Sequence, residues 1–292
     1  MYRSLIEAIR DAEAQGISLS RLALDTEARD QGRPVQEIRD ALRRALAVMR
    51  GAIDQGATGD LRSSSGLVGG DAAKLRTETP PVIGPLFRDV LMRAVAVQEV
   101  NAAMGVIVAA PTAGGAGVLP AVLTGLAAAH HVPDDRLVDA LATAGLIGAV
   151  VAERASLSGA EGGCQAETGA AAGMAAGAAT EMLGGTPTQV GHAVALAQQA
   201  TLGLICDPLG GLVELPCVFR NATGAAIALA AVEMALAGVT FAIPSDEVID
   251  VMGEIGREMD VRYRETAGGG LAATPTGRRL ARERLTQIKR AP

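Results

Sequence analysis

From about residue 85 to residue 260, long alanine-rich apolar segments alternate with short stretches rich in glycine and proline. Hydrophobic residues make up 49% of the 292-residue chain, yet aromatic residues make up only 2%. Such small side chains let helices pack closely, whereas β-sandwiches favour aromatic and β-branched residues. Period-two alternation, the mark of a half-buried strand, is nearly absent. The sequence therefore predicts an all-α fold, a large bundle of buried helices interrupted by Gly/Pro loops.

Apolar periodicity and turn residues give the expected helix bounds. A charged helical segment, residues 1–60, is expected in front of an all-helical body, residues 61–292, within one continuous domain. Asp134, Asp135 and Ser245 follow prolines and are the expected N-caps. We expect helices over residues 2–15, 34–57, 85–104, 116–131, 134–155, 165–183, 188–203, 218–238 and 245–260, and a short basic helix near the C-terminus.

Charge and hydropathy exclude two classes of partner. The net charge is −6 and no basic stripe is interleaved with aromatic residues, so nucleic acid is not expected to bind. Residues 100–133 carry no charged side chain and residues 222–243 carry only Glu233, so both are long enough to cross a membrane. Because prolines and glycines break the first and neither has an aromatic belt, we interpret both as buried helices. The start lacks the apolar region of a secretory signal, which favours a cytoplasmic location.

The three cysteines, Cys164, Cys206 and Cys217, each lie beside a glycine or proline where a loop meets a helix. One interpretation is that they are inert buried side chains, as free cysteines often are. The other is chemical, because thiols in a reducing compartment more often bind metal or react than form disulfides. Cys164 and Cys217 are expected at helix N-termini, where the helix dipole would lower the thiol pKa.

Three thiolates are compatible with more than one cofactor. Structural zinc needs a fourth ligand, for which His192 is a candidate. A [4Fe–4S] cluster held by only three cysteines leaves one iron open to substrate oxygen, which suits loss of water from a hydroxy acid. Pyridoxal phosphate would need a Schiff-base lysine, and Lys74 is the candidate, although the cysteines would then be unexplained.

Other polar residues are candidates for substrate contacts. In "PTAGGAGVLP" (111–120), Thr112, Gly114 and Gly115 can form an anion-binding nest or merely a tight turn. Lys74, with Asp71 in "GGDAAKL", can orient substrate or simply be solvated. Glu99 borders a long uncharged run, where burial would raise its pKa and suit it as a base.

The remaining candidates border these same segments. Asn101 lies beside Glu99 in "QEVNAAMG", where a helix-end hydrogen bond is the alternative to a catalytic role. Glu161 and Glu167 flank Cys164, where they can bond near a cofactor or favour a helix N-terminus. Arg220 and Asn221 follow Cys217 and are candidates for binding a carboxylate or offsetting cofactor charge.

Longer motifs carry a resemblance beyond these individual residues. "NAAMGVIVAAPTAGGAGVLP", "SGAEGGCQAETG" and "LGLICDPLGGLVELPCVFRN" closely resemble the α-chain of bacterial iron–sulfur-dependent L-serine dehydratase, as do "GLVGGDAAKL" and "GLAATPTGRRL". The resemblance covers the chain from about residue 56 onward, and the N-terminal stretch is compatible with it.

The resemblance implies a [4Fe–4S] cluster bound by Cys164, Cys206 and Cys217, with L-serine as substrate and pyruvate and ammonia as products. Some family members are single chains with a second domain in front, and some place a cysteine at the C-terminus; this chain ends "KRAP". It therefore resembles the α-subunit of the two-chain form, a hetero-oligomer in which a separate β-subunit completes the site and can supply the base. The alternative is a non-catalytic helical scaffold or binding subunit with structural or zinc-binding thiols.

Overall fold

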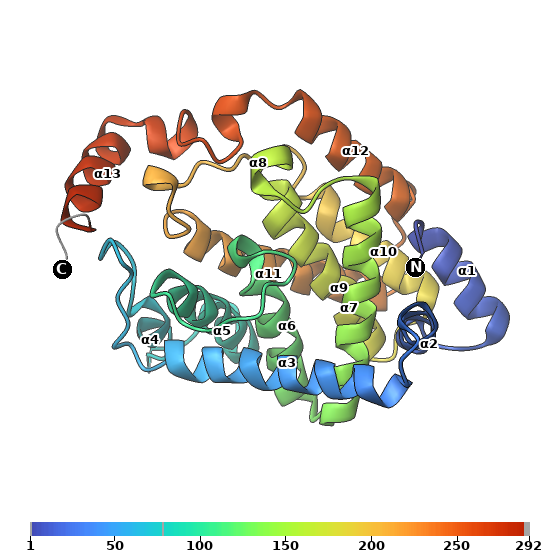
Figure 1. Ribbon diagram of the computed structural model, residues 1–292. Helices are drawn as coiled ribbons and strands as arrows, with labels where there is room; N and C mark the ends of the chain where they lie inside the picture. The colour runs from blue at the N-terminus through green and yellow to red at the C-terminus, as the bar shows by residue number, and fades with distance from the viewer. Residues whose placement is uncertain (1, 78, 289–292) are drawn as a thin grey trace.

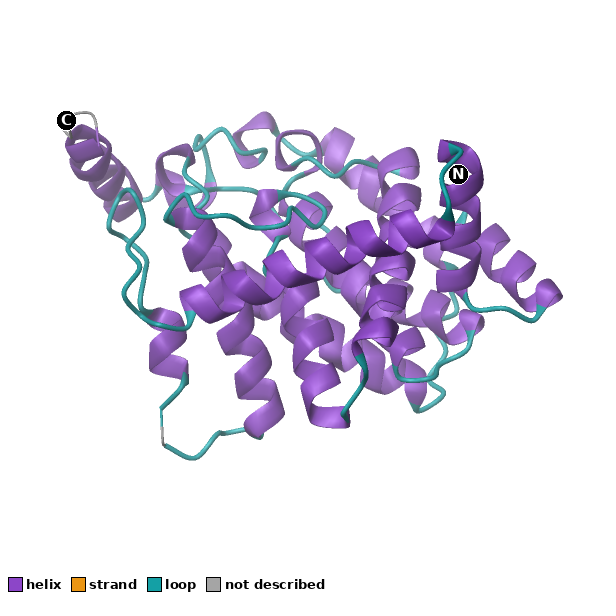
Figure 2. Ribbon diagram, turned by 60° about the horizontal axis from the view of Figure 1, so that its bottom comes forward, coloured by secondary structure: helices purple, strands orange, loops and turns teal. Residues whose placement is uncertain are grey.

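The computed structural model describes residues 2–77 and 79–288, and in this part of the chain helices joined by loops are the only regular elements (Figures 1 and 2). Its only β-type pairing is an isolated bridge between Cys206 and Arg264. The predicted all-α fold is thus confirmed. The longer helices are α1 (Leu5–Gln15), α2 (Leu19–Gln31), α3 (Val35–Gly56), α5 (Pro85–Ala102), α6 (Val118–His130), α7 (Asp134–Arg154), α9 (Ala170–Met182), α10 (Pro187–Gln199), α11 (Cys217–Leu236), α12 (Ser245–Glu258) and α13 (Pro275–Ile288).

Short helical turns fill several of the connections. The five-residue segment η2 (Gln165–Gly169) is a π-helix that leads directly into α9. The predicted helix 165–183 is therefore confirmed in extent, but it begins with wider turns than an α-helix. The other short elements are α4 (Asp71–Leu75), α8 (Gly159–Gly162), η1 (Ala113–Gly115), η3 (Leu209–Gly211), η4 (Val261–Tyr263) and η5 (Gly270–Ala273).

Helix α9 is the centre of the molecule, and all of its 13 residues are buried. It contacts α6, α7, α10 and α11, which surround it. A Cβ at Gly177 would lie 2.5 Å from Ile147 Cδ1 of α7, and one at Gly173 would lie 2.8 Å from Gln198 Cγ of α10. These contacts are closer than any real Cβ makes, so glycine is required where the neighbouring helices approach.

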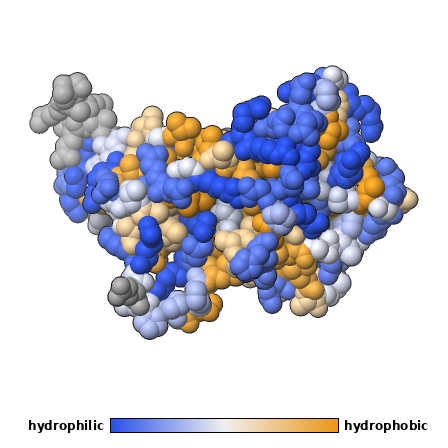
Figure 3. Space-filling model, turned by 90° about the horizontal axis from the view of Figure 1, so that it is seen from below, coloured by the Kyte–Doolittle hydropathy of each residue, from blue (hydrophilic) through white to orange (hydrophobic). Residues whose placement is uncertain are grey.

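The N-terminal helices pack on this core rather than standing apart from it. Leu5 and Ile9 of α1, Leu22 of α2 and Met49 of α3 belong to the same apolar cluster as α9. Helix α3 runs along the bottom of Figure 1, and the face seen from below has a hydrophilic band beside apolar areas, as an amphipathic surface helix requires (Figure 3). The boundary predicted near residue 60 stays a prediction.

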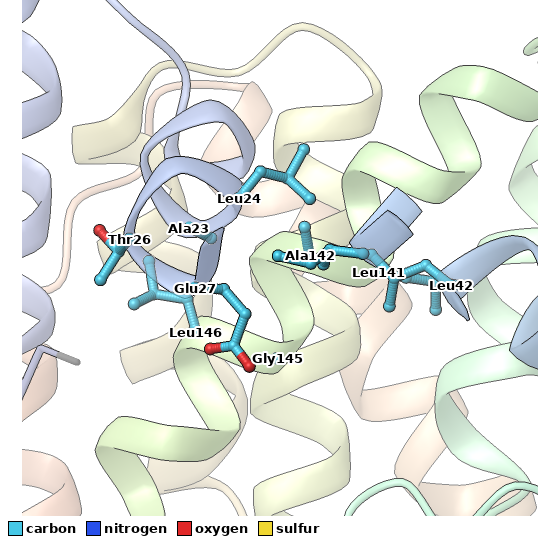
Figure 4. Close-up of a pocket in the computed structure, with 10 residues that line it drawn as sticks. Ala23, Leu24, Thr26, Glu27, Leu42, Leu141, Ala142, Gly145 and Leu146 are labelled. Atoms are coloured by element: carbon cyan, nitrogen blue, oxygen red, sulfur yellow. The ribbon is translucent and has the colours of Figure 1, made fainter. Parts of the chain in front are cut away.

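An apolar cavity of about 220 Å³ lies between α2, α3 and α7 (Figure 4). Leucine and alanine side chains form most of its wall, and Glu27 is the one charged residue on its lining. A Cβ at Gly145 of α7 would meet no atom within 4 Å, so the cavity extends to this glycine.

The predicted N-caps are wrong. The N-cap positions of α7 and α12 are occupied by Pro133 and Pro244, and neither helix has a side-chain cap. Asp134 and Asp135 lie one residue further along and form ion pairs with arginines of α3 instead. Ser245 is likewise the first residue inside its helix.

Two segments are long and apolar enough to cross a membrane, Ala113–His130 and Cys217–Leu236. In the folded chain, 78% and 44% of these windows are buried against other helices. Core helices pass the same length and composition test, and α6 and α11 both contact α9. This packing supports our interpretation of the two segments as buried helices.

Helix α2 was not expected from the sequence, and its start is held by a residue far along the chain. The buried Glu181 carboxylate of α9 accepts hydrogen bonds from the backbone N–H of Leu19 at 2.9 Å and Ser20 at 3.1 Å, and from Thr143 Oγ1 at 3.0 Å. Replacing Glu181 with alanine strands these buried donors. We expect a loss of about 3 kcal/mol in the free energy of unfolding, measured by urea denaturation.

Two further variants make this test specific. Glu181→Gln keeps one acceptor oxygen and should lose less stability than Glu181→Ala. Glu258→Ala, at an exposed position of α12, should leave the urea midpoint nearly unchanged. Equal losses at Glu181 and Glu258 would contradict the capping role.

Candidate active site

The three cysteines come from three separate segments. Cys164 directly precedes the π-helix, Cys206 lies in the loop after α10, and Cys217 is the first residue of α11. All three are free thiols and are buried, with exposed fractions of 3%, 2% and 6%. Single-turn π-helices occur often at functional sites. The fold therefore buries a thiol group at the N-terminal end of its central helix.

Hydrogen bonds from the π-helix bring the second cysteine beside the first. Gln165 donates its backbone N–H to Leu204 O at 3.0 Å, and its side-chain oxygen accepts from Gly203 N at 2.9 Å. The backbone of Cys206 is held on both sides. Its N–H donates to Tyr263 O and its carbonyl oxygen accepts from Glu265 N, each at 2.8 Å. Segments distant in sequence thus determine where the Cys206 thiol lies.

The thiols are near enough to influence one another. Burial raises the pKa of all three, and that of Cys217 reaches about 12. For Cys206, charge on Cys164 or Cys217 raises the pKa further, after burial, because like charges repel. The Cys164 and Cys217 pKa values are thus raised where the sequence predicted a lowering at helix N-termini, and burial is the largest cause of the rise.

Glu167 of the π-helix faces this thiol group. Its Oε1 accepts a hydrogen bond from Thr112 Oγ1 at 2.7 Å, and its Oε2 lies 3.8 Å from Cys206 Sγ. Burial raises its pKa, and the Thr112 hydrogen bond opposes that rise. Cβ atoms at Gly114 and Gly159 would come within 2.8 and 2.6 Å of its carboxylate, so both glycines make room for it.

The second acid near Cys164 lies elsewhere. Glu161 accepts a hydrogen bond from Ser156 Oγ at 2.6 Å and is exposed. The sequence pointed to Glu161 and Glu167 equally. The two differ in position because Glu167 belongs to the π-helix, whose backbone directs its side chain toward Cys206.

The loop at residues 110–117 is held by side-chain amides. Asn221 of α11 donates to Gly114 O at 2.6 Å and accepts from Gly117 N at 2.9 Å, and Asn101 of α5 donates to Ala113 O at 3.3 Å. The Gly115 N–H is also engaged, with Thr112 O at 3.3 Å. The amides of Gly115 and Gly117 are therefore not free for an anion, and Asn221 and Asn101 position the loop.

Arg220 also lies within electrostatic reach of the thiol group. Its guanidinium forms an ion pair with the buried Asp207 at 2.8 Å and donates to Ile205 O at 2.9 Å. Its charge lowers the pKa of Cys164 and Cys217, partly offsetting the effect of burial. Arg220 thus ties α11 to the Cys206 loop and supplies positive charge beside the sulfurs.

Lys74 and Glu99 meet at the short helix α4. Lys74 is exposed and forms an ion pair with Asp71 at 2.6 Å, while Glu99 Oε1 accepts the Asp71 backbone N–H at 2.6 Å. Glu99 Oε2 is buried and has no hydrogen-bond partner among the described residues. Burial raises the Glu99 pKa, as predicted, and the nearby backbone N–H groups oppose the rise.

The described part of the chain forms no ready-made site for a single metal ion. Within residues 2–77 and 79–288, no three His, Cys, Asp or Glu side chains are close enough to hold a single ion. His192, the predicted fourth zinc ligand, accepts from Phe241 N at 3.3 Å and lines a cavity with α1 and residues 241–245 instead. The chain is thus an all-helical protein whose interior holds three buried, unpaired thiols within electrostatic reach of one another, a class whose thiols can be inert or can bind a shared ligand.

Known proteins identify the family within this class. The Serine dehydratase alpha chain family matches residues 14–272. A probable L-serine dehydratase alpha chain from Bacillus subtilis is 47% identical over 97% of this chain and 95% of its own length. The L-serine dehydratase alpha chain of Peptoniphilus asaccharolyticus is 37% identical over 98% of this chain and 99% of its own length.

A longer relative shows the same segment within a larger protein. The L-serine dehydratase of Streptomyces coelicolor is 42% identical over 93% of this chain, but the match covers only 60% of that relative. The chain thus belongs to the serine dehydratase alpha chain family, and the resemblance seen in the sequence motifs is confirmed. Its relatives are dehydratases, which are lyases.

The unpartnered oxygen of Glu99 generates a pH-dependent prediction. Because its folded-state pKa is raised, the folded chain binds this proton more tightly than the unfolded chain. Stability is therefore lost as pH rises from the unfolded pKa through the folded one. Glu99→Gln cannot ionise, so we expect it to be more stable than the wild type near about pH 8, with the difference shrinking toward about pH 4.

Urea unfolding at a series of pH values measures this difference. Glu254→Gln, at an exposed position of α12, is the matched control and should follow the wild-type curve. Parallel stability curves for wild type and Glu99→Gln across the whole pH range would show that the Glu99 pKa is the same in the folded and the unfolded chain.

Proposed function

We propose that the chain is the α-subunit of an L-serine dehydratase that converts L-serine to pyruvate and ammonia with a [4Fe–4S] cluster. The observation that carries the proposal is the group of three buried, unpaired thiols, Cys164, Cys206 and Cys217, in a member of the serine dehydratase alpha chain family. A cysteine with a purely structural role does not need other thiols nearby. Three thiols within electrostatic reach of one another are suited to binding one shared ligand.

The surroundings of the thiols fit such a group. Cys164 and Cys217 both lie within electrostatic reach of Cys206, as ligands of one shared cluster must. Gly159 has no side chain, which leaves space beside Cys206, because a Cβ there would lie 3.1 Å from Cys206 Sγ. Arg220 supplies positive charge that offsets the thiolates' negative charge. When bound, the cluster would supply a Lewis-acidic iron for the substrate hydroxyl.

The reaction must remove the weakly acidic Cα proton of serine and expel its hydroxyl, which is a poor leaving group. The Cα proton passes to a base, the Cβ–O bond breaks, and the hydroxyl takes up one proton and leaves as water, so that the step releases no net proton. The aminoacrylate so formed tautomerises to an imine, which water hydrolyses to pyruvate and ammonia. Thr112, held against Glu167 beside Cys206, is the hydroxyl of this chain that we assign to orienting the substrate.

We assign the base to a second chain. Glu99 has an exposed fraction of 1% and already accepts a backbone N–H of α4, while Lys74 is exposed and paired with Asp71. The longer Streptomyces coelicolor relative carries sequence beyond the matched segment, as a fused partner domain would. A separate β-subunit, and hence a hetero-oligomer, follows for this chain.

Exposed apolar side chains support a partner near the thiol group. Met104 and Val106 precede the Thr112 loop and are 83% and 74% exposed, and Phe219, two residues after Cys217, is 44% exposed. Burying such side chains against a β-subunit would stabilise the complex. Three unpaired thiols also suit a reducing compartment, and we place the enzyme in the cytoplasm.

Anaerobic reconstitution with iron and sulfide tests the cofactor and the reaction separately. We expect cluster absorbance with about four iron and four sulfide per chain, and pyruvate from L-serine once a β-chain is added. Alanine at any one of the three cysteines should abolish both signals. Thr180→Ala, a buried polar change on α9, should preserve both. A colourless chain under every condition would overturn the cluster and favour the structural-subunit alternative.

Gly159 offers a test that leaves every thiol in place. Its Cβ would lie 2.6 Å from Glu167 Oε2 and 3.1 Å from Cys206 Sγ, so Gly159→Val must displace one of them. We expect cluster yield to fall severalfold while all three thiols remain titratable after denaturation. Gly51→Val, at an exposed position of α3 where a Cβ meets nothing within 4 Å, is the matched control. Equal cluster yields would show that the space beside Gly159 is not needed.

A further inference from the structure

A second site lies away from the thiols, between α1, α10 and the turn before α12. A cavity of about 390 Å³ opens there. Isoleucines of α1 and the Phe241–Pro244 segment form its apolar wall, and its polar lining includes Arg10, His192 and Ser245. None of these residues belongs to the thiol group, and the function proposed above does not use them.

Ser245 is the first residue of α12 and has an exposed fraction of 2%, yet its hydroxyl has no hydrogen-bond partner among the described residues. A buried hydroxyl without a partner costs free energy, so such groups are rare in folded proteins. The helix that it begins also has no side-chain cap, which leaves N-terminal N–H groups of α12 without a capping acceptor. An acceptor from outside the chain would satisfy both.

Two further polar side chains of the cavity, His192 and Arg10, can also donate a hydrogen bond to a ligand. His192 Nδ1 accepts the Phe241 N–H at 3.3 Å, which leaves Nε2 as the donor nitrogen. Arg10 is exposed on α1, and its guanidinium has no hydrogen bond or ion pair with the described residues. A guanidinium, an imidazole N–H and a hydroxyl on one cavity form a donor set suited to a carboxylate.

The rest of the lining limits what the anion can be. Glu13 carries the one negative charge on the lining and accepts from Thr188 Oγ1 at 2.5 Å, so a dianion would meet about twice the repulsion that a monoanion meets. Ile6, Ile9 and Phe241 offer apolar contact to the remainder of the ligand. We propose that this cavity binds a small monocarboxylate with a short apolar tail, its carboxylate accepting from Arg10, His192 and Ser245.

Binding of 3-methylbutanoate to the full-length chain tests the proposal by ligand-observed NMR titration. We expect saturable binding, and none by 3-methylbutan-1-ol, which has the same tail and no carboxylate. Arg10→Gln and Ser245→Ala should each weaken binding by about tenfold, the usual effect of losing one charge-assisted hydrogen bond. Arg44→Gln, the same charge change at an exposed position of α3, should leave the affinity unchanged.

Thermal unfolding separates a lost contact from a damaged fold. Without ligand, Ser245→Ala should unfold at or above the wild-type temperature, because it removes an unpartnered buried hydroxyl. With 3-methylbutanoate, the wild type should gain stability and the variant much less. Equal stabilisation of both, equal binding of the alcohol, or no binding to the wild type would each overturn the proposal. None of these readouts depends on dehydratase activity or on a cluster.

Discussion

The rest of the structure depends on a helix that is buried on every side. Helix α9 consists mostly of alanine and glycine, and at Gly173 and Gly177 the side chains of neighbouring helices occupy the space that a Cβ would need. Burial here comes from close backbone approach rather than from large side chains, which explains a core with almost no aromatic residues. Because the π-helix continues directly into α9, the Cys164 thiol is buried in the same way as α9.

Loops inside an apolar body must satisfy their backbone groups without water, and side chains from distant segments do so here. Asn221 bonds both a carbonyl and an N–H of the loop at residues 110–117. Glu214, in the segment between Cys206 and Cys217, accepts from Ser63 Oγ at 2.6 Å and Ser65 N at 3.2 Å. These bonds hold the loop that carries Thr112 and the segment that joins Cys206 to Cys217, so backbone groups near the thiols have partners without water.

Helix positions could be predicted from sequence because composition and periodicity are local signals, and most expected segments are helices within a few residues. Helix α2 was missed although Ser18 caps it locally by accepting from Arg21 N, and the Glu181 carboxylate, which also binds its first N–H groups, lies 162 residues away in the chain. The approach of the cysteines could not be derived from their spacing, since it rests on bonds such as Gln165 to Leu204. Family resemblance supplied that part, while the inward turn of Glu167 follows from a π-helix that periodicity does not reveal.

Helix α12 physically connects the two sites. Ser245 begins it at the carboxylate cavity, and two turns later Met252 O accepts from Gln165 Nε2 of the π-helix at 3.0 Å. Gly256 packs so closely on α8 that a Cβ would lie 2.8 Å from Gly162 Cα. A shared rigid element is not by itself coupling, because a ligand shifts an equilibrium only by its unequal affinity for two arrangements. A carboxylate that caps α12 can therefore influence the thiol group only if α12 has a second position, and the close contact at Gly256 requires any such movement to carry α8 and the π-helix with it.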